Sequence, residues 1–210
     1  MNERDQTISQ IDSRRRKLVR TFSVGGIPGF IAVADGALWV LDADSGSLLR
    51  LDPQGVVDKR LRLSEPNILH LAKNSGLEIR GAVWLSSGYD NRLTRYGPSV
   101  KSRTSIFVGA DGSNISSVGV GAGSVWVADS GTNKLWQIDP IHAVPIRSIP
   151  VGNIPLGVAV GIGSVWVANG GDGTVSRIDP QSGTATDTIQ VGQTPTKIAF
   201  AEGLVGIAVD

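Results

Sequence analysis

The sequence of 210 residues contains no cysteine and only two histidines. The lack of cysteine excludes disulfide bonds and thiolate metal sites, and it leaves the redox compartment of the protein open. Neither sign of charge dominates, because 20 Lys and Arg are balanced by 19 Asp and Glu. Net charge therefore gives no reason to expect binding to nucleic acid or to an anionic membrane.

Long apolar runs are also missing. No window approaches the roughly 18 apolar residues of a membrane span, and the first residues, MNERDQTISQ, lack the apolar core of a signal peptide. We expect neither a membrane span nor a signal peptide in this chain. Capped stretches with helical periodicity are missing as well, which disfavours folds that alternate strands with helices.

What the sequence does contain is an internal repeat. Its landmarks are a tryptophan at intervals of 45, 42 and 40 residues, a pair ending in proline thirteen residues later, and a recurring Val-Gly pair. The tryptophans are Trp39, Trp84, Trp126 and Trp166, and the pairs are Asp52-Pro53, Gly97-Pro98, Asp139-Pro140 and Asp179-Pro180. Three landmarks with a common spacing indicate one structural unit that is used several times.

Residues 151–190 show the content of one unit. They hold four short runs rich in β-branched residues, LGVAV, SVWVA, TVSRI and TATDTI, with Gly, Pro, Asn or Asp at each boundary. Four strands in each repeat of this length are typical of a β-propeller blade. The sequence therefore predicts an all-β fold, a β-propeller of four-stranded blades.

The two ends of the chain complement each other in this repeat. Residues 7–26 align with 174–193, the third and fourth strands of a unit, and residues 191–210 align with 151–170, the first and second. We expect a single domain over 1–210, with units at 21–63, 64–107, 108–150 and 151–190, and a fifth at 191–210 completed by 5–20. Pairing of the N-terminal outer strands with the C-terminal inner strands would close five blades and remove exposed edges.

A fragment of a six- or seven-bladed propeller is the alternative to this closed ring. Gly206 stands where the fifth unit should carry its tryptophan, so the last unit is atypical, as terminal repeats often are.

The stretch VGNIPLGVAVGIGSVWVANGGDGTVSRIDPQSG at 151–183 resembles the YVTN-type β-propeller repeat, which is related to NHL and virginiamycin B lyase-like propellers. The resemblance extends over 5–210 and is weakest at 64–107. It implies the fold but no single function, because such repeats occur in surface and periplasmic proteins, sensor modules, nucleic-acid-associated proteins and an antibiotic-opening lyase. The resemblance implies an extracytoplasmic protein or a domain of a larger one.

The repeated tryptophans are interpreted as core residues. Each stands in the second strand of its unit between aliphatic neighbours, and both faces of a blade pack against other blades. We therefore expect Trp39, Trp84, Trp126 and Trp166 to pack between blades. Stacking on a ligand is the alternative.

Asp and Asn residues follow the second strand of most units, and two more lie in one of the loops between units. They are Asp42, Asp129 and Asn169 at the strand ends, Asp44, Asp90 and Asp172 further along the turns, and Asp111 and Asn114 in the loop 109–115. Such side chains commonly cap turns. Because these loops share one face of a propeller, the same residues are also candidates for binding a ligand or a divalent cation there.

Few residues are suited to catalysis. His70 occupies a first-strand position that would face the channel, and local repacking beside an insertion is the other interpretation. No Ser-His-Asp or Cys-His motif is present. The resemblance to virginiamycin B lyase would imply a metal with histidine and glutamate chemistry, yet the two histidines lie far apart in the repeat. We expect no catalytic residue, no metal ligand and no required cofactor.

The run Arg14-Arg15-Arg16-Lys17 occupies a turn of the fifth unit, where we expect it to be solvated. Contact with nucleic acid or an acidic partner is the alternative, although Phe22 is the single aromatic residue nearby. We expect a non-enzymatic binding, scaffold or sensor propeller whose loops recognise a protein, peptide or glycan rather than nucleic acid. The alternative is a metal-dependent lyase or hydrolase resembling virginiamycin B lyase.

Overall fold

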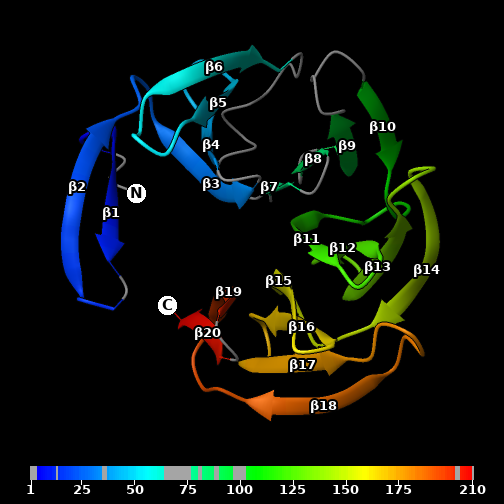
Figure 1. The fold of residues 1–210 in the computed structure, drawn as a ribbon. Coiled ribbons are helices and arrows are strands. Elements are labelled where there is room, and N and C mark those ends of the chain that lie inside the picture. The colour runs from blue at the N-terminus through cyan, green and yellow to red at the C-terminus, as the bar shows by residue number, and fades with distance from the viewer. Residues whose placement is uncertain are drawn as a thin grey trace. The chain divides into compact units, whose positions relative to one another are not determined.

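The computed structural model describes residues 4–12, 14–34, 37–63, 77–79, 82–87, 90–96, 103–201 and 204–209. These residues form the strands β1 to β20 and the turns between them, without a helix, so the described part of the chain holds no helix that could cross a membrane (Figure 1). The chain divides into two compact units, Met1–Lys73 and Asn74–Asp210. The predicted all-β fold is confirmed.

The first unit contains a hairpin and one four-stranded antiparallel sheet. The hairpin consists of β1 (Thr7–Asp12) and β2 (Lys17–Ser23). The sheet has the order β3 (Pro28–Ala34), β4 (Ala37–Asp42), β5 (Ser47–Leu51) and β6 (Val57–Arg62). Ile8 of the hairpin packs with Val40, Leu49 and Leu51 of the sheet, so the two pieces share one core.

The second unit contains three four-stranded sheets and a two-stranded one, all antiparallel. The first sheet has β7 (Leu77–Ile79), β8 (Val83–Ser87), β9 (Arg92–Tyr96) and β10 (Arg103–Phe107). The second has β11 (Ile115–Gly121), β12 (Ser124–Asp129), β13 (Lys134–Asp139) and β14 (Val144–Pro150). The third has β15 (Pro155–Gly161), β16 (Ser164–Asn169), β17 (Thr174–Ile178) and β18 (Ala185–Gln190), and the last has β19 (Pro195–Ala201) and β20 (Leu204–Val209).

Each complete sheet follows the chain, so that strands adjacent in sequence are also adjacent in space (Figure 1). Two-residue turns join β11 to β12, at Ala122-Gly123, and β15 to β16, at Ile162-Gly163. Both residues of each turn have positive φ. Two such residues give the type I′ turn that matches the twist of a hairpin. These turns lie in the sequence segments GAGS, at 121–124, and GIGS, at 161–164.

Sheets in the second unit pack face to face through apolar side chains. Trp126, Leu135 and Ile149 of one sheet form a buried cluster with Val165 and Ile178 of the next. The first strands of neighbouring sheets also approach closely. A Cβ at Gly121 would lie 2.6 Å from a methyl carbon of Val160, so only glycine allows this approach.

The repeated tryptophans differ in burial. Trp39, Trp84 and Trp126 are buried, at 7%, 1% and 0% exposure. Trp166 is only half-buried, which departs from the expectation of full burial. By the repeat, it lies on the side of its sheet that meets β19 and β20, and a two-stranded sheet covers less of its ring than a four-stranded one.

The strands at the two ends, β1–β2 and β19–β20, each form a two-stranded sheet within their own unit. Closure into five blades, the unit boundaries and the single domain remain predictions of the repeat alignment. Much of the unit predicted at 64–107, including His70, lies outside the described residues.

Candidate functional site

Two of the turns after the second strands are held by buried carboxylates, Asp129 and Asp42. Asp129 is 0% exposed, and its Oδ1 accepts hydrogen bonds from the backbone N–H of Asn114 at 2.9 Å and of Gly131 and Thr132 at 3.2 Å each. Its Oδ2 accepts from the Thr132 hydroxyl at 2.5 Å and from the Trp136 indole N–H at 3.2 Å. One side chain thus ties the turn 129–134 to the preceding loop 109–115.

Asp42 holds the equivalent turn in the first unit. It is 1% exposed and accepts hydrogen bonds from the backbone N–H of Ile27 and Asp44, both at 3.1 Å, and from the Ser45 hydroxyl at 2.5 Å. Arg60 forms an ion pair with it at 3.4 Å. The oxygen atoms of Asp42 and Asp129 are therefore already engaged by turn donors.

These bonds also set the charge state of Asp129. Burial raises the pKa of its carboxyl, but hydrogen bonds from Thr132, Asn114, Ser113 and Trp136 outweigh burial, so the pKa lies below its ordinary value. The ionised form is the one that the turn stabilises.

In the sheet β15–β18, two residues, Asn169 and Asp172, take the place of the single turn-holding aspartate. Asn169 stands at the end of β16, and Asp172 three residues later accepts hydrogen bonds from the Asn153 backbone N–H at 2.6 Å and from its Nδ2 at 2.7 Å. Asn169 is fully buried, and its Nδ2 donates to the hydroxyls of Thr174 at 3.0 Å and Ser176 at 2.8 Å. Its Oδ1 is buried and has no partner among the described residues.

The side chains of the other predicted residues that the structure describes lie outside these caps, although the backbone N–H groups of Asp44 and Asn114 take part in them. Asp90 forms an ion pair with Arg92 at 3.1 Å, and the Asp44 and Asp111 side chains are exposed. Asn114 serves the loop through its backbone, since its carbonyl oxygen accepts from the Ser130 N–H at 2.9 Å. The binding role predicted for this set of residues remains a prediction.

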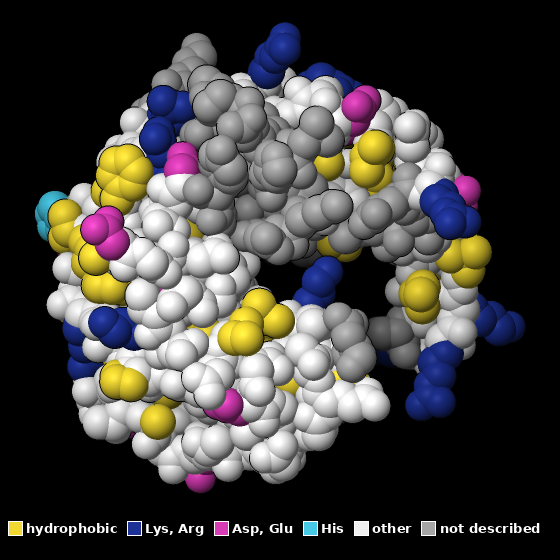
Figure 2. Space-filling view, turned by 180° about the vertical axis from the view of Figure 1, so that it is seen from behind, with side chains coloured by type: hydrophobic (Ala, Val, Ile, Leu, Met, Phe, Trp, Pro, Cys, Tyr) yellow, Lys and Arg dark blue, Asp and Glu magenta, His cyan; other side chains and the backbone are white. Residues whose placement is uncertain are grey.

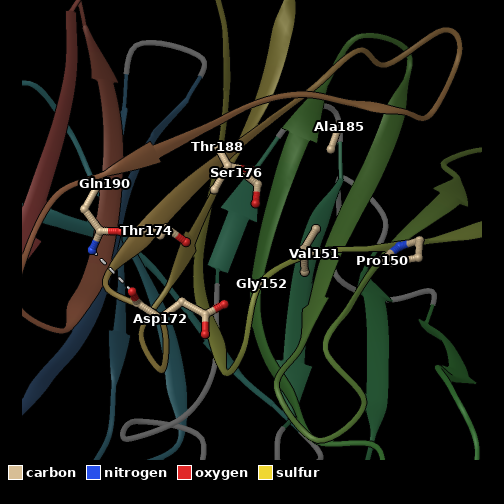
Figure 3. Close-up of a pocket in the computed structure, with 9 residues that line it drawn as sticks. All are labelled: Pro150, Val151, Gly152, Asp172, Thr174, Ser176, Ala185, Thr188 and Gln190. Atoms are coloured by element: carbon tan, nitrogen blue, oxygen red, sulfur yellow. Dashed lines mark hydrogen bonds between the residues drawn. The ribbon is translucent and has the colours of Figure 1, made fainter.

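A pocket of about 480 Å³ opens between β17–β18 and the segment that follows β14 (Figure 3). We call it the β17–β18 pocket. Its lining residues are Pro150, Val151, Gly152, Asp172, Thr174, Ser176, Ala185, Thr188 and Gln190. In the β17–β18 ladder, Thr174 is directly opposite Gln190 and Ser176 is directly opposite Thr188. One wall of the pocket is therefore a patch of hydrogen-bonding side chains on one face of a sheet.

The preceding repeat explains why the pocket exists. Trp136 occupies in β13 the position that Ser176 occupies in β17, because both are paired with the middle valine of the strand before, Val127 and Val167. The indole of Trp136 packs against the apolar cluster between its own sheet and the preceding one, and it donates to Asp129. In the next sheet a serine stands in its place, and the space is left open.

Sequence reasoning missed this pocket, although the signal was present. Trp136 falls outside the series of repeated tryptophans, and comparing the third strands residue by residue would have shown that a bulky side chain alternates with a hydroxyl at this position. Of the lining residues, the predicted set had included Asp172 alone.

Other titratable groups do not form a cluster around the pocket. Among the described residues, no group of three His, Cys, Asp or Glu side chains is placed to hold a metal ion. His142, in the turn after β13, is exposed, and its Nδ1 lies 2.7 Å from Asp139 Oδ2. Exposed Ile141, Val144 and Ile146 belong to the same turn and β14, and hydrophobic side chains border the histidine in Figure 2.

No family model matches the chain, and no curated protein matches it. Solved structures do. A streptogramin B lyase has a TM-score of 0.78 at 15% identity, over 99% of this chain and 70% of that one. A catalytically inactive virginiamycin B lyase from Staphylococcus aureus, with quinupristin, has a TM-score of 0.78 at 17% identity, over 98% and 71%.

The Pan2 WD40 domain from Neurospora crassa is also similar, with a TM-score of 0.70 at 11% identity, over 92% of this chain and 62% of that one. All these structures are β-propellers of low sequence identity to this chain, so the likeness concerns the fold. Together with the repeated four-stranded antiparallel sheets, it shows that the chain is a β-propeller-repeat protein. The predicted fold class is thereby confirmed.

Proposed function

We propose that this β-propeller is a non-enzymatic recognition module and that its ligand binds in the β17–β18 pocket. The observation that carries the proposal is the exchange of Trp136 for Ser176 between consecutive repeats. Sheets of this kind normally pack without voids. A repeat that could fill the space with an indole, and instead lines it with hydroxyls, gives up packing where a ligand would gain hydrogen bonds.

The lining residues favour reversible binding over covalent chemistry. Asp172 is the one charged side chain among them, and it is held by two hydrogen bonds from Asn153. Thr174 and Ser176 are held by Asn169, an amide that cannot act as a general base. A rigid arrangement of neutral hydrogen-bonding groups is what a binding site requires.

Replacing Ser176 by Trp tests the proposal, because the neighbouring repeat already accommodates this residue. We expect S176W to fold and to fill the pocket. Thermal shift against a library of sugars, amino acids, short peptides and nucleosides should find compounds that stabilise the wild-type chain and not S176W. Thr186→Val, on β18 but outside the lining, serves as the control and should respond like the wild type. Identical responses of S176W and wild type to every compound would refute the proposal.

The second candidate is a metal-dependent lyase or hydrolase, which the fold shared with streptogramin B lyase favours. Its test is the thermal unfolding midpoint with Mg²⁺, Ca²⁺ and EDTA. Stabilisation by several degrees from a divalent metal, present equally in S176W, would support the lyase and count against the recognition module.

A further inference from the structure

The two walls of the β17–β18 pocket differ in chemistry, and this difference indicates the class of ligand if the proposed function holds. One wall is the ladder that pairs Thr174 with Gln190 and Ser176 with Thr188. Pro150 and Val151, which follow from the end of β14, line the pocket on another side (Figure 3). A ligand that fills this space meets hydrogen-bonding groups on one side and apolar carbon on the other.

Asn169 determines how two of the hydroxyls can act. Its Nδ2 donates to both Thr174 Oγ1 and Ser176 Oγ, and a hydroxyl that accepts at its oxygen keeps its own hydrogen for another acceptor. Thr174 and Ser176 can therefore donate to a ligand. In the preceding repeat the carboxylate of Asp129 instead accepts the hydrogen of a hydroxyl, that of Thr132, which stands at the position of Asp172.

The buried Oδ1 of Asn169, without a partner among the described residues, is the cost of this arrangement. An unpartnered buried carbonyl is unfavourable, and Asp42 and Asp129 show that an aspartate is well accommodated at this position in two other repeats. Asn169 thus differs from these aspartates in carrying amide hydrogens that it can offer to the two hydroxyls, which a carboxylate lacks.

Asp172 adds an acceptor beside these donors. Each of its oxygens receives a hydrogen bond from Asn153, and a carboxylate has further lone pairs that can accept from a ligand. The lining contains no Lys, Arg or His, so nothing in it would compensate an anionic ligand. Neighbouring hydrogen-bond donors and acceptors suit a ligand whose groups both donate and accept hydrogen bonds.

We propose that the β17–β18 pocket binds a neutral polyhydroxylated ring, the size of one pyranose, either as a free sugar or as the terminal sugar of a glycan. Each sugar hydroxyl donates and accepts, which matches Thr174, Ser176 and Asp172, and the C–H face of the ring packs against Pro150 and Val151. A donor-only ammonium ligand would leave the hydroxyl hydrogens of Thr174 and Ser176 unmatched, and a hydrocarbon ring would leave every polar group unmatched.

Isothermal titration and saturation-transfer NMR on the full chain test this inference. The probes are the methyl α-pyranosides of glucose, galactose and mannose, with ethanolamine and cyclohexanemethanol as donor-only and apolar controls. We expect at least one glycoside to bind with a dissociation constant of roughly 1 mM, as a small ligand in an open site should, and neither control to bind. A glycan array distinguishes the two sources. The protein should bind to the array if it recognises the terminal sugar of a glycan, and it should not bind if the sugar must be free.

Matched variants locate the binding. Ser176→Ala and Thr188→Val each remove one hydroxyl and should weaken binding about 3- to 10-fold, the value of one neutral hydrogen bond. Thr186→Val should leave binding unchanged, and S176W should abolish it. Unfolding midpoints of all four variants establish that each is folded, and the two conservative ones keep the test valid if S176W does not fold.

The outcomes separate this inference from the proposed function. Binding of glycosides that S176W and Thr188→Val leave intact would overturn the sugar assignment to this pocket. Failure of every glycoside, while another library compound binds in a way that S176W abolishes, would overturn the sugar inference and leave the recognition module standing. If no compound distinguishes S176W from the wild type, both are wrong.

Discussion

Asp129 provides a demanding test of how the propeller turns are held. Asp129→Ala removes the acceptor of hydrogen bonds from three backbone N–H groups and from the side chains of Thr132, Trp136 and Ser113. The site is fully buried, so water cannot replace the carboxylate without local opening. The two loops that it joins should lose their connection together.

The expected loss of unfolding free energy follows from these contacts. A hydrogen bond to a charged group contributes about 1.5–3 kcal/mol, but several bonds to one carboxylate are not independent. Because the substitution leaves several buried donors without an acceptor at once, we expect Asp129→Ala to lose about 3–5 kcal/mol, the upper part of the range for single substitutions. Urea unfolding followed by tryptophan fluorescence measures it. Asp139→Ala, which removes a half-exposed turn cap, is the control and should lose less.

The pH dependence gives a second measurement. Because the pKa of Asp129 is lower in the folded than in the unfolded chain, its contribution is fully present above the unfolded value, about 3.9, and disappears as the pH falls through the folded value. Asp129→Asn should therefore flatten the stability profile on the acid side. A loss below about 1 kcal/mol for Asp129→Ala, or an acid profile of Asp129→Asn identical to the wild type, would refute the reasoning.

The remaining predictions concern packing and closure. Trp126→Ala should cost about 3–5 kcal/mol in urea unfolding, and Trp166→Ala less, because Trp166 is less completely buried; equal losses would contradict this. Gly121→Ala should cost about 1–3 kcal/mol by overpacking against the neighbouring strand, and an unchanged midpoint would contradict the close approach. The repeat alignment predicts that Ser9 pairs with Ile207 if five blades close, so Ser9→Cys with Ile207→Cys should form a disulfide in this cysteine-free chain under mild oxidation, whereas reduced monomer alone would contradict closure.

The sequence predicted which residues stand in the turns, but not which of them are buried turn caps and which lie at a pocket. Each of four turns carries a carboxylate either at the end of the second strand, as in Asp42 and Asp129, or three residues later, as in Asp90 and Asp172, and the first turn also carries Asp44. In the sequence these residues look equivalent. Their hydrogen bonds distinguish them, because a carboxylate at the strand end is buried and accepts hydrogen bonds from the turn, whereas Asp172 lies at the edge of a pocket.

Strands, turns and the propeller class were determined by the sequence alone. Alternation of side chains along a strand and the special φ angles of turn residues are local properties, and a repeat multiplies each local signal. The β17–β18 pocket was decided by tertiary structure, because it depends on what one side chain leaves unfilled between a strand and the segment that crosses it. Ser176 is unremarkable in its own repeat and becomes informative only where the fold sets it in the place that Trp136 fills in the repeat before.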